Sequence, residues 1–519
     1  MTPKTRDRGS KIGDQNGIPY ASLGVTVTQL VTDSREIKRG DTFVAYAGEK
    51  TDGRQFIAQA IERGANAVIW ESDNFAREFI WNDAWQVPNL GVSDLRHRAG
   101  WLADAVYGAP SEKLWMVGIT GTNGKTSTSH WITQALNDMG KRCALIGTLG
   151  NGFLGALQTS ANTTPDAIHV HGMLADYVRE GAQAVAMEVS SHALSQGRVN
   201  GVRFDVAMLT NLSRDHLDYH GDMQNYAAAK RKLFDWQQLK FAVLNLDDAF
   251  GRELAEQLQD ADVEVIGYGL SDQALQLAER LGLRMVYGSL LEMTGQGLRL
   301  VVHSSWGAAQ LDSALVGRFN AENLLGALAV LLVRGIGLSD IGLGEAVRSL
   351  SKVQPVAGRM QRLGDVRQPT VIVDYAHSPD ALEKVLLALR EVSVSSGNKL
   401  ICVFGCGGDR DRGKRAMMGK VAEKFSDLCI VTSDNPRSEN PRDIIAEIVS
   451  GMSGANHEVI VDRAVAIHHA VGQAQPSDTV LIAGTGHENY QEINGVKHPF
   501  SDELIARQAL QVSHGEVYT

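Results

Sequence analysis

Short apolar runs alternate with amphipathic stretches along nearly the whole chain, which predicts strands and helices in alternation. The clearest stretch is residues 114–139. There an apolar strand (114–119) leads into a glycine-rich turn and then a helix with apolar residues at the helical period. Further strands are predicted at 31–35, 40–45, 65–70, 144–147, 184–189, 206–209, 241–244, 371–374, 400–404, 428–432 and 479–483. Helices are predicted at 55–63, 222–236 (with Asp222 as cap) and 317–334.

This alternation indicates an α/β protein whose sheets are mostly parallel and covered by helices on both faces. A length of 519 residues fits about three domains of roughly 150 residues each. We predict a disordered lead-in (1–20), a small N-terminal α/β domain (21–110), a central domain (111–352) and a C-terminal α/β domain (353–519).

Composition narrows the class of protein. A net charge of -10 argues against a nucleic-acid or membrane-surface binder. The polar N-terminus lacks the apolar segment of a signal peptide, and the longest apolar run (324–333) is too short to span a bilayer. The four cysteines fit structural thiols in a reducing compartment, because Cys402 and Cys406 have no second pair to complete a zinc site. We therefore expect a cytoplasmic protein.

Residues 118–126 read G-x-x-G-x-x-G-K-T, a variant of the phosphate-binding loop between a strand and a helix. Gly121 and Gly124 allow backbone N–H groups to turn toward phosphate oxygens. Lys125 supplies a positive charge beside the β- and γ-phosphates, and Thr126 offers a hydroxyl to Mg²⁺. The alternative is a tight turn whose glycines serve packing alone.

Polar residues follow three strands of the central domain, at 162–164, 188–192 and 211–216. Because ligands of parallel sheets lie beyond the carboxyl ends of the strands, Glu188 and His216 could reach a cation held by Thr126. A capping or packing role for His216 is the alternative.

Lys230 falls in the apolar stripe of the helix predicted at 222–236. It either extends its ammonium to solvent or is a lysine of depressed pKa available for covalent modification. The sequence does not choose between these two interpretations. Likewise, Asn320 and Asn323 could face a nucleotide base or cap the helix at 317–334.

Four polar loops follow the predicted strands of the C-terminal domain, at 374–379, 405–415, 433–441 and 484–490. Together they predict a composite site that faces the phosphate-binding loop. In the N-terminal domain, residues 32–35 (T-D-S-R) would on their own be interpreted as turn chemistry.

Taken together and in order, the motifs G-I-T-G-T-N-G-K-T-S, A-M-E-V-S-S-H, N-L-S-R-D-H-L-D-Y-H-G, Y-A-A-A-K, G-R-F-N-A-E-N, D-Y-A-H-S-P and D-N-P-R make the chain resemble the Mur ligase family over nearly its whole length. The resemblance implies a uridine-binding N-terminal domain, a P-loop ATPase-like central domain and a Rossmann-like C-terminal domain. It also implies an ATP-dependent, Mg²⁺-requiring amide ligase of peptidoglycan synthesis. Such an enzyme phosphorylates the D-Glu side-chain carboxylate of UDP-N-acetylmuramoyl-L-alanyl-D-glutamate, and an amine then attacks the acyl phosphate.

The resemblance assigns roles residue by residue. It implies catalytic roles for Lys125, Lys230, His216 and Arg359, with Thr126, Glu188, His216 and a carbamylated Lys230 around Mg²⁺. ATP would contact Gly121, Thr122, Asn123, Gly124, Lys125, Thr126, Ser127, Asn323, Asp374 and His377. The UDP-muramoyl-dipeptide would contact Thr32, Ser34, Glu49, Lys50, Thr51, Asn162, Thr163, Thr164, Ser190, Gln196 and Arg198; of these, Glu49, Lys50 and Thr51 depart from the family's side chains and would act through backbone.

The incoming amino acid would contact Arg410, Asp434, Asn435, Pro436, Arg437, Gly484 and Glu488. meso-2,6-Diaminopimelate carries a distal carboxylate that lysine lacks, and Arg437 can clamp it bidentately while Glu488 holds the ammonium. Two departures from the family pattern are Thr485, where a lysine is usual, and Ala416, where a proline is common.

Three other hypotheses compete with this one: a lysine-adding ligase of the same family, folylpolyglutamate synthase, and a non-catalytic nucleotide-gated binding module. We expect a monomer that binds small molecules, binds no nucleic acid and does not insert into a membrane.

Overall fold

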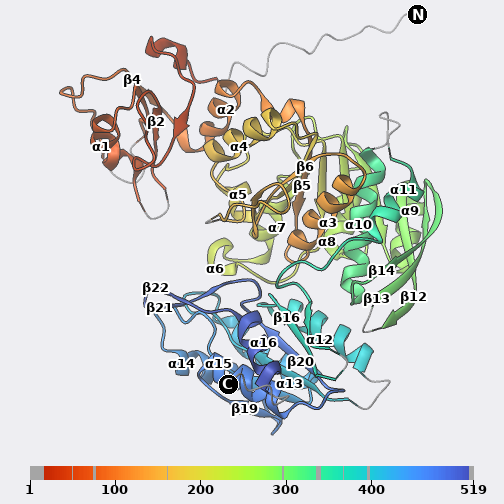
Figure 1. The fold of residues 1–519 in the computed structure, drawn as a ribbon. Coiled ribbons are helices and arrows are strands. Elements are labelled where there is room, and N and C mark those ends of the chain that lie inside the picture. The colour runs from red at the N-terminus through yellow and green to blue at the C-terminus, as the bar shows by residue number, and fades with distance from the viewer. Residues whose placement is uncertain are drawn as a thin grey trace, which may run out of the picture. The chain divides into compact units, whose positions relative to one another are not determined.

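The computed structural model describes residues 17–48, 51–73, 78–160, 162–294, 297–334, 341–365, 367–393 and 398–512. Two compact units divide this chain. The first holds residues 1–118, 141–205 and 235–239, and the second holds 119–140, 206–234 and 240–519. Each unit is α/β in character (Figure 1), as the sequence predicts. Among the described residues, no helix is both long and apolar enough to cross a bilayer.

A small four-stranded parallel sheet, in the order β1-β2-β3-β4, builds the N-terminal part. Its elements are η1 (Tyr20–Leu23), β1 (Leu30–Val31), β2 (Thr42–Ala45), η2 (Gly53–Phe56), α1 (Ile57–Glu62), β3 (Ala67–Glu71), β4 (Asn89–Val92), α2 (Leu95–Val106) and η3 (Pro110–Lys113). The predicted strand at 31–35 is wrong beyond Val31. Asp33 accepts from the backbone N–H of Arg35 at 2.9 Å and pairs with its guanidinium, which closes a turn instead.

A ten-stranded sheet forms the middle of the fold, in the order β14-β13-β12-β11-β10-β9-β5-β8-β6-β7. Its strands are β5 (Trp115–Thr120), β6 (Cys143–Gly147), β7 (Gly150–Gly152), β8 (Ala184–Glu188), β9 (Val206–Leu209), β10 (Phe241–Asn245), β11 (Glu264–Gly269), β12 (Arg284–Thr294), β13 (Gly297–Ser304) and β14 (Gly307–Ser313). The ladders from β9 to β12 are parallel, whereas β12, β13 and β14 form an antiparallel meander that the sequence interpretation missed.

The helices of this region are α3 (Lys125–Asp138), α4 (Ala167–Arg179), α5 (Ser191–Ser195), α6 (Leu217–His220), α7 (Met223–Arg231), α8 (Ala249–Gln257), α9 (Asp272–Leu281), α10 (Arg318–Arg334) and α11 (Leu343–Leu350). Five of them, α4, α5, α7, α8 and α9, begin at an Asp or Ser whose side chain accepts from the first backbone N–H groups. Asp222 caps α7 as predicted, accepting from the N–H of Asn225 at 2.8 Å. The helix ends at Arg231, five residues before the predicted end, and a turn follows.

A six-stranded sheet builds the C-terminal part, in the order β15-β16-β20-β17-β18-β19. Its elements are β15 (Gln361–Leu363), β16 (Thr370–Asp374), α12 (Pro379–Ser393), β17 (Leu400–Phe404), α13 (Gly413–Phe425), β18 (Leu428–Val431), α14 (Pro441–Val449), β19 (His457–Val459), α15 (Arg463–Gln473), β20 (Thr479–Ala483), the hairpin β21 (Tyr490–Ile493) and β22 (Val496–Pro499), and α16 (Asp502–Val512). Alternate strand residues pack against α12, α13 and α14 on one face and against α15 and α16 on the other (Figure 1). The four cysteines are free and buried.

Candidate active site

The glycine-rich loop after β5 has the backbone that the sequence predicts for phosphate binding. Gly121 has φ 148° and Gly124 has φ 86°, both in the region that favours glycine. A Cβ at Gly121 would lie 1.9 Å from Oγ1 of Thr210, and one at Gly124 would lie 2.6 Å from Oδ1 of Asn323. The loop therefore requires these two glycines for shape as well as for packing, and α3 begins directly after Gly124.

The loop is anchored to the chain that follows β9. The N–H of Thr122 donates to the carbonyl oxygen of Asn211 at 2.9 Å, and the N–H of Asn123 donates to Oδ1 of the same residue at 2.9 Å. The hydroxyl of Thr210 donates to the carbonyl oxygen of Asn123 at 2.6 Å. Thr122 and Asn123 belong to the glycine-rich motif, and Asn211 begins the motif that follows β9. These hydrogen bonds therefore bring two motifs that the sequence singled out into one site.

Two lysines converge on one carbonyl oxygen of this loop. Nζ of Lys125 lies 2.9 Å from the oxygen of Gly121, and Nζ of Lys230 lies 2.7 Å from the same oxygen. Lys230 is 1% exposed and its Nζ stands 4.5 Å from the ring centroid of Tyr226. The interpretation in which Lys230 extends its ammonium to solvent is therefore wrong.

Burial, and then the charge of Lys125, hold the pKa of Lys230 well below its usual range, against the opposing effect of Asp215. A lowered pKa increases the fraction of the amine that is unprotonated, and an unprotonated amine is the nucleophile that adds CO₂. The structure thus supplies the chemical condition for carbamylation, whereas the modification itself stays a prediction.

Three predicted nucleotide-site residues cluster at the start of the C-terminal part. Nη2 of Arg359 lies 3.3 Å from Oγ1 of Thr126, and its guanidinium stacks 4.4 Å from the ring centroid of Tyr375. His377 pairs through Nε2 with Asp215 at 3.4 Å. Asp374 is buried and accepts from the N–H groups of Met360 and Ala376 at 2.7 and 2.8 Å. With these two hydrogen bonds the Asp374 carboxylate fixes the backbone at residues 360 and 376 beside the site.

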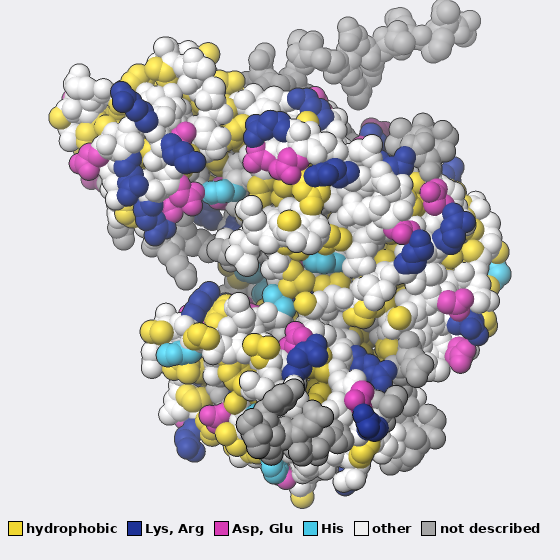
Figure 2. Space-filling view, viewed as in Figure 1, with side chains coloured by type: hydrophobic (Ala, Val, Ile, Leu, Met, Phe, Trp, Pro, Cys, Tyr) yellow, Lys and Arg dark blue, Asp and Glu magenta, His cyan; other side chains and the backbone are white. Residues whose placement is uncertain are grey.

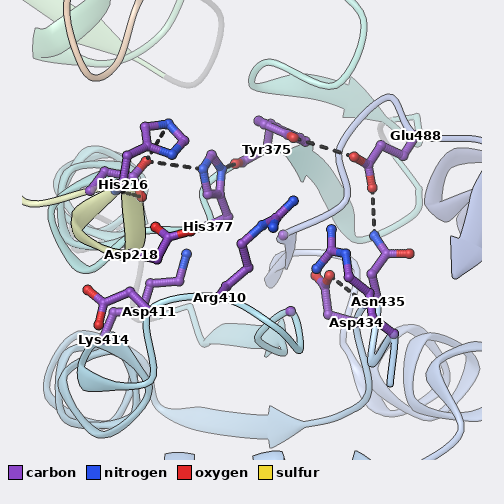
Figure 3. Close-up of a pocket in the computed structure, with 14 residues that line it drawn as sticks. His216, Asp218, Tyr375, His377, Arg410, Asp411, Lys414, Asp434, Asn435 and Glu488 are labelled. Atoms are coloured by element: carbon purple, nitrogen blue, oxygen red, sulfur yellow. Dashed lines mark hydrogen bonds and ion pairs between the residues drawn. The ribbon is translucent and has the colours of Figure 1, made fainter. Parts of the chain in front are cut away.

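A pocket with a cavity volume of about 70 Å³, part of it open to solvent, lies among the strand-end loops of the second unit (Figure 3). Six of the seven residues predicted for the amino-acid site line it, and Pro436 does not. The lining is Asp215, His216, Asp218, Tyr375, His377, Gly407, Arg410, Asp411, Lys414, Asp434, Asn435, Arg437, Gly484 and Glu488. Sequence reasoning missed Asp215, Asp218, Tyr375, Gly407, Asp411 and Lys414, although all six stand within motifs or loops that it singled out.

Charges of both signs face this pocket, which suits a ligand that carries both signs itself. Figure 3 shows Arg410 between the loop of Asp411 and Lys414 and the side of Asp434, Asn435 and Glu488. Glu488 accepts from Nδ2 of Asn435 at 2.7 Å and from the hydroxyl of Tyr375 at 3.4 Å. Burial and the neighbouring Asp434 raise the pKa of Glu488, so a cationic partner would stabilise its charged form.

Asp215 joins the pocket to the loop after β9. Burial would raise its pKa, but the imidazole of His377, with His216 and Lys414, outweighs that effect and holds the pKa well below its usual range. Asp215 is therefore ionised at neutral pH and pairs with groups from two polar loops that are far apart in the sequence.

The departure at Thr485 has a structural explanation. Thr485 is 1% exposed and its hydroxyl donates to Asp502, which also pairs with Arg463 at 2.7 Å. Arg463 donates further to the carbonyl oxygen of Ala483 at 3.0 Å. Both partners of the pair are fully buried, so Arg463 supplies the cation that neutralises Asp502. Neither Thr485 nor Ala416 lines the pocket.

Residues predicted for the muramoyl-dipeptide gather in the first unit. The hydroxyl of Thr164 donates to the carbonyl oxygen of Glu188 at 2.8 Å and accepts from the N–H of Ser190 at 3.2 Å. Arg198 donates to the carbonyl oxygen of Thr164 at 2.8 Å and to Gln196 at 2.7 Å. Thr163 contacts Thr148, whose N–H and hydroxyl donate to the Glu188 carboxylate at 2.9 and 3.1 Å. Asn162 is exposed.

The residues predicted for the uridine end are less closely joined. Ser34 is buried and donates to Gln59 at 2.6 Å, whereas Thr51 is exposed. Glu49 and Lys50 lie outside the described residues. The assignment of this group to uridine stays a prediction.

The donors available to Mg²⁺ are mixed in kind. The described part of the chain holds no cluster of three or more His, Cys, Asp or Glu side chains suited to a metal. Mg²⁺ prefers oxygen ligands, and the hydroxyl of Thr126 and the carboxylate of Glu188 fit that preference. Lys230 fits only as a carbamate, because an amine that donates to Gly121 offers no oxygen.

Comparison with known proteins shows the family of the chain. Three family models match: "Mur ligase family, catalytic domain" at residues 26–107, "Mur ligase middle domain" at 119–331 and "Mur ligase, glutamate ligase domain" at 358–486. A UDP-N-acetylmuramoyl-L-alanyl-D-glutamate–2,6-diaminopimelate ligase of Chromobacterium violaceum is 52% identical over 97% of this chain and 98% of its own length. The enzyme of that name from Nitrosomonas europaea is 51% identical over 94% of each chain.

A solved structure of a ligase with the same name is 38% identical, has a TM-score of 0.64, and is matched over 94% of this chain and 95% of its own. The three-domain α/β architecture that the sequence predicts is thereby confirmed, although none of these matches tests the predicted domain boundaries or site residues. The chain belongs to the Mur ligase family.

Proposed function

We propose that this chain is the ATP-dependent, ADP-forming ligase that joins meso-2,6-diaminopimelate to the D-Glu side-chain carboxylate of UDP-N-acetylmuramoyl-L-alanyl-D-glutamate. The observation that carries the proposal is the pocket in which Arg410 and Arg437 stand with Asp434 and Glu488. Diaminopimelate has two ammonium and two carboxylate groups, and a pocket of paired signs can hold such a ligand. The names of the two relatives over 50% identical support the same substrates.

The chemistry divides into two steps. The D-Glu carboxylate oxygen attacks the γ-phosphorus of ATP, the bond to the bridging oxygen breaks, and ADP leaves. The unprotonated amine of diaminopimelate then attacks the acyl phosphate, a tetrahedral intermediate forms, and it collapses to the amide and inorganic phosphate as the amine loses its proton. Lys125 and the N–H groups of residues 121–127 would bind the transferred phosphoryl group and stabilise its charge.

Thr126, Glu188, His216 and the Lys230 carbamate would hold Mg²⁺, which neutralises phosphate charge when bound. As a carbamate, Lys230 would change from a cation that repels the metal into an anionic oxygen ligand. Arg359 stands beside Thr126, where it would contact the same phosphates. Asn323, which packs on Gly124, would face the nucleotide together with Asp374 and His377.

The remaining predicted residues would bind the UDP-linked substrate. Asn162, Thr163, Thr164, Ser190, Gln196 and Arg198 would contact the muramoyl-dipeptide, and Thr32, Ser34 and the backbone of residues 49–51 would contact the uridine end. We place the reaction in the cytoplasm, where ATP is available, and expect a monomer to carry it out.

The lysine-adding ligase is the main alternative. Lysine lacks a distal carboxylate and gives Arg437 no partner, so the D-N-P-R loop favours diaminopimelate. Folylpolyglutamate synthase does not require a uridine-binding N-terminal part. A non-catalytic binding module does not require Lys125 and Lys230 together at the phosphate-binding loop.

The acyl-phosphate route can be followed with substrate labelled by heavy oxygen in the D-Glu side-chain carboxylate. Purified protein with ATP, Mg²⁺ and diaminopimelate should yield a UDP-linked tripeptide by mass spectrometry and inorganic phosphate carrying one heavy oxygen per turnover. Tripeptide with unlabelled phosphate would reject the acyl phosphate, and an unchanged dipeptide would reject the ligase.

A further inference from the structure

The hairpin β21–β22 is bound closely to the loop that carries D-N-P-R. The N–H of Glu492 donates to Oδ1 of Asn435 at 2.7 Å, and Nε2 of Gln491 donates to the carbonyl oxygen of Asp434 at 2.5 Å. The N–H of Arg437 donates to the carbonyl oxygen of Glu492 at 3.0 Å, and the N–H of Asn494 donates to the carbonyl oxygen of Arg437 at 2.7 Å. Each residue from 434 to 437 except the proline is thus held by the hairpin.

This attachment fixes an unusual backbone. Arg437 has φ 51°, in the left-handed region that a long side chain adopts only when its surroundings stabilise it. Its two backbone hydrogen bonds to β21 and to the turn of the hairpin supply that stabilisation. The hairpin itself is partly exposed, with Ile493 and Val496 at 37% and 56%, and Figure 2 shows apolar and basic side chains over this end of the molecule.

The side chain of Arg437 is held by the hairpin and by the loop after β17. Its Nε lies 3.4 Å from Oε2 of Glu492, and its Nη1 donates to the carbonyl oxygen of Gly408 at 2.8 Å. A guanidinium has five N–H donors in a rigid plane, and a carboxylate ligand binds bidentately to one edge of that plane. Contacts at Nε and at one hydrogen of Nη1 leave the edge formed by Nη1 and Nη2 for a ligand.

We propose that Glu492 is a positioning residue that sets the selectivity of the pocket for an amino acid with a distal carboxylate. It does so by holding the Arg437 guanidinium with its bidentate edge toward the ligand. This inference rests on the proposed function, because it takes diaminopimelate as the amino acid that Arg437 binds. Glu492 lies outside the set of residues that line the pocket, so it acts through Arg437 and not by contact.

The test is a double-mutant cycle in full-length protein, with phosphate release measured against the concentration of diaminopimelate. Glu492→Ala should raise KM for diaminopimelate about tenfold and leave kcat within about twofold. The reason is that an arginine that can rotate loses conformational entropy when the ligand orders it. Glu492→Gln keeps a polar oxygen near Nε without the negative charge and should raise KM about threefold or less. In an Arg437→Ala background, Glu492→Ala should change kcat/KM by less than about twofold.

Lys497→Ala is the matched control, because Lys497 is the cross-strand partner of Glu492 in the hairpin and its ammonium lies over the ring of Tyr490. It should leave KM within about twofold of wild type. The inference is overturned if Glu492→Ala leaves KM unchanged, or if it lowers kcat/KM by the same factor with and without Arg437. If wild-type protein itself turns over lysine and not diaminopimelate, the proposed function fails first, and the wild-type rates alone show it.

Discussion

The buried ion pair under the amino-acid pocket predicts a large loss of stability when one partner is removed. Asp502 and Arg463 are both fully buried, and Nε and Nη2 of the arginine lie 2.8 and 2.7 Å from the two carboxylate oxygens. Asp502→Ala would leave a guanidinium in the protein interior without the carboxylate that contacts it. Burial opposes the charge of Arg463, whereas Asp502, Asp434 and Glu488 raise its pKa. A guanidinium is not deprotonated in proteins, so the arginine stays charged in the variant even without Asp502.

The magnitude follows from this geometry. Removing one partner of a buried pair costs about 3–5 kcal/mol, because the remaining charge is uncompensated. With a denaturant dependence of about 2 kcal/mol per molar urea, the unfolding midpoint of the six-stranded sheet should fall by about 1.5–2.5 M. Replacing both partners by apolar residues, as in Arg463→Met with Asp502→Leu, should cost less than the single change.

Cysteine labelling provides a local assay. Cys402 and Cys429 are buried in β17 and β18 of this sheet, Cys406 follows β17, and Cys143 in β6 reports the middle of the fold. Urea titration with thiol labelling, resolved by peptide mass spectrometry, would follow both regions. All eight tryptophans precede residue 307, so their fluorescence reports the remainder of the chain.

Glu503→Ala is the control, because its partner Arg507 is exposed on the same helix and such pairs contribute little. It should shift the labelling midpoint by less than about 0.3 M. A shift of less than 0.5 M for Asp502→Ala would refute the reasoning, since it would mean that the arginine is not left uncompensated.

Three further predictions concern the phosphate-binding loop and a buried histidine. Lys230→Met should lower phosphate release at least about 100-fold with the fold intact, whereas Arg231→Met on the outer side of α7 should stay within about twofold; equal losses would reject the role of Lys230. Gly121→Ala, which forces a Cβ against Thr210, should weaken ATP binding in a calorimetric titration by about 10-fold or more, and Gly344→Ala, where a Cβ meets nothing within 4 Å, should not. Burial lowers the pKa of His171 to about 4, so its neutral form contributes stability above pH 6.5 that is lost as the pH falls toward 4. Between pH 6.5 and 4.5 the free energy of unfolding, measured by urea titration, should fall by roughly 2 kcal/mol more in wild type than in His171→Gln, and equal falls would show that His171 is not the group responsible.

Patterns within short stretches of sequence predicted the features that depend on neighbouring residues. The phosphate-binding loop, the cap at Asp222 and the strand ends that carry Glu188 and Asp434 all follow from turn residues and apolar period within a short window. The interpretation failed at β1, because the Asp33–Arg35 pair closes a turn where the sequence predicts a strand. It also failed at the β12–β14 meander, where buried and exposed positions do not match a regular alternation of apolar and polar residues in the sequence.

Long-range pairing was out of reach of the sequence. Nothing in the chain near Thr485 indicates that Arg463 neutralises Asp502, or that Asp215 pairs with His377, because those contacts depend on how strands are ordered in a sheet. The order β15-β16-β20-β17-β18-β19 brings the ends of β18 and β20 to opposite sides of β17, and the polar loops of the pocket meet there. Position in the sheet, more than residue type, thus decides which charges face the ligand.

The central claim is that the chain joins diaminopimelate, and not lysine, to the UDP-linked dipeptide. Phosphate release by purified protein with ATP, Mg²⁺ and UDP-N-acetylmuramoyl-L-alanyl-D-glutamate tests it directly when the two amino acids are compared. The structure predicts release with meso-diaminopimelate and little with L-lysine, and loss of most of that activity in Arg437→Ala. Release with lysine, or full activity in Arg437→Ala, would contradict it.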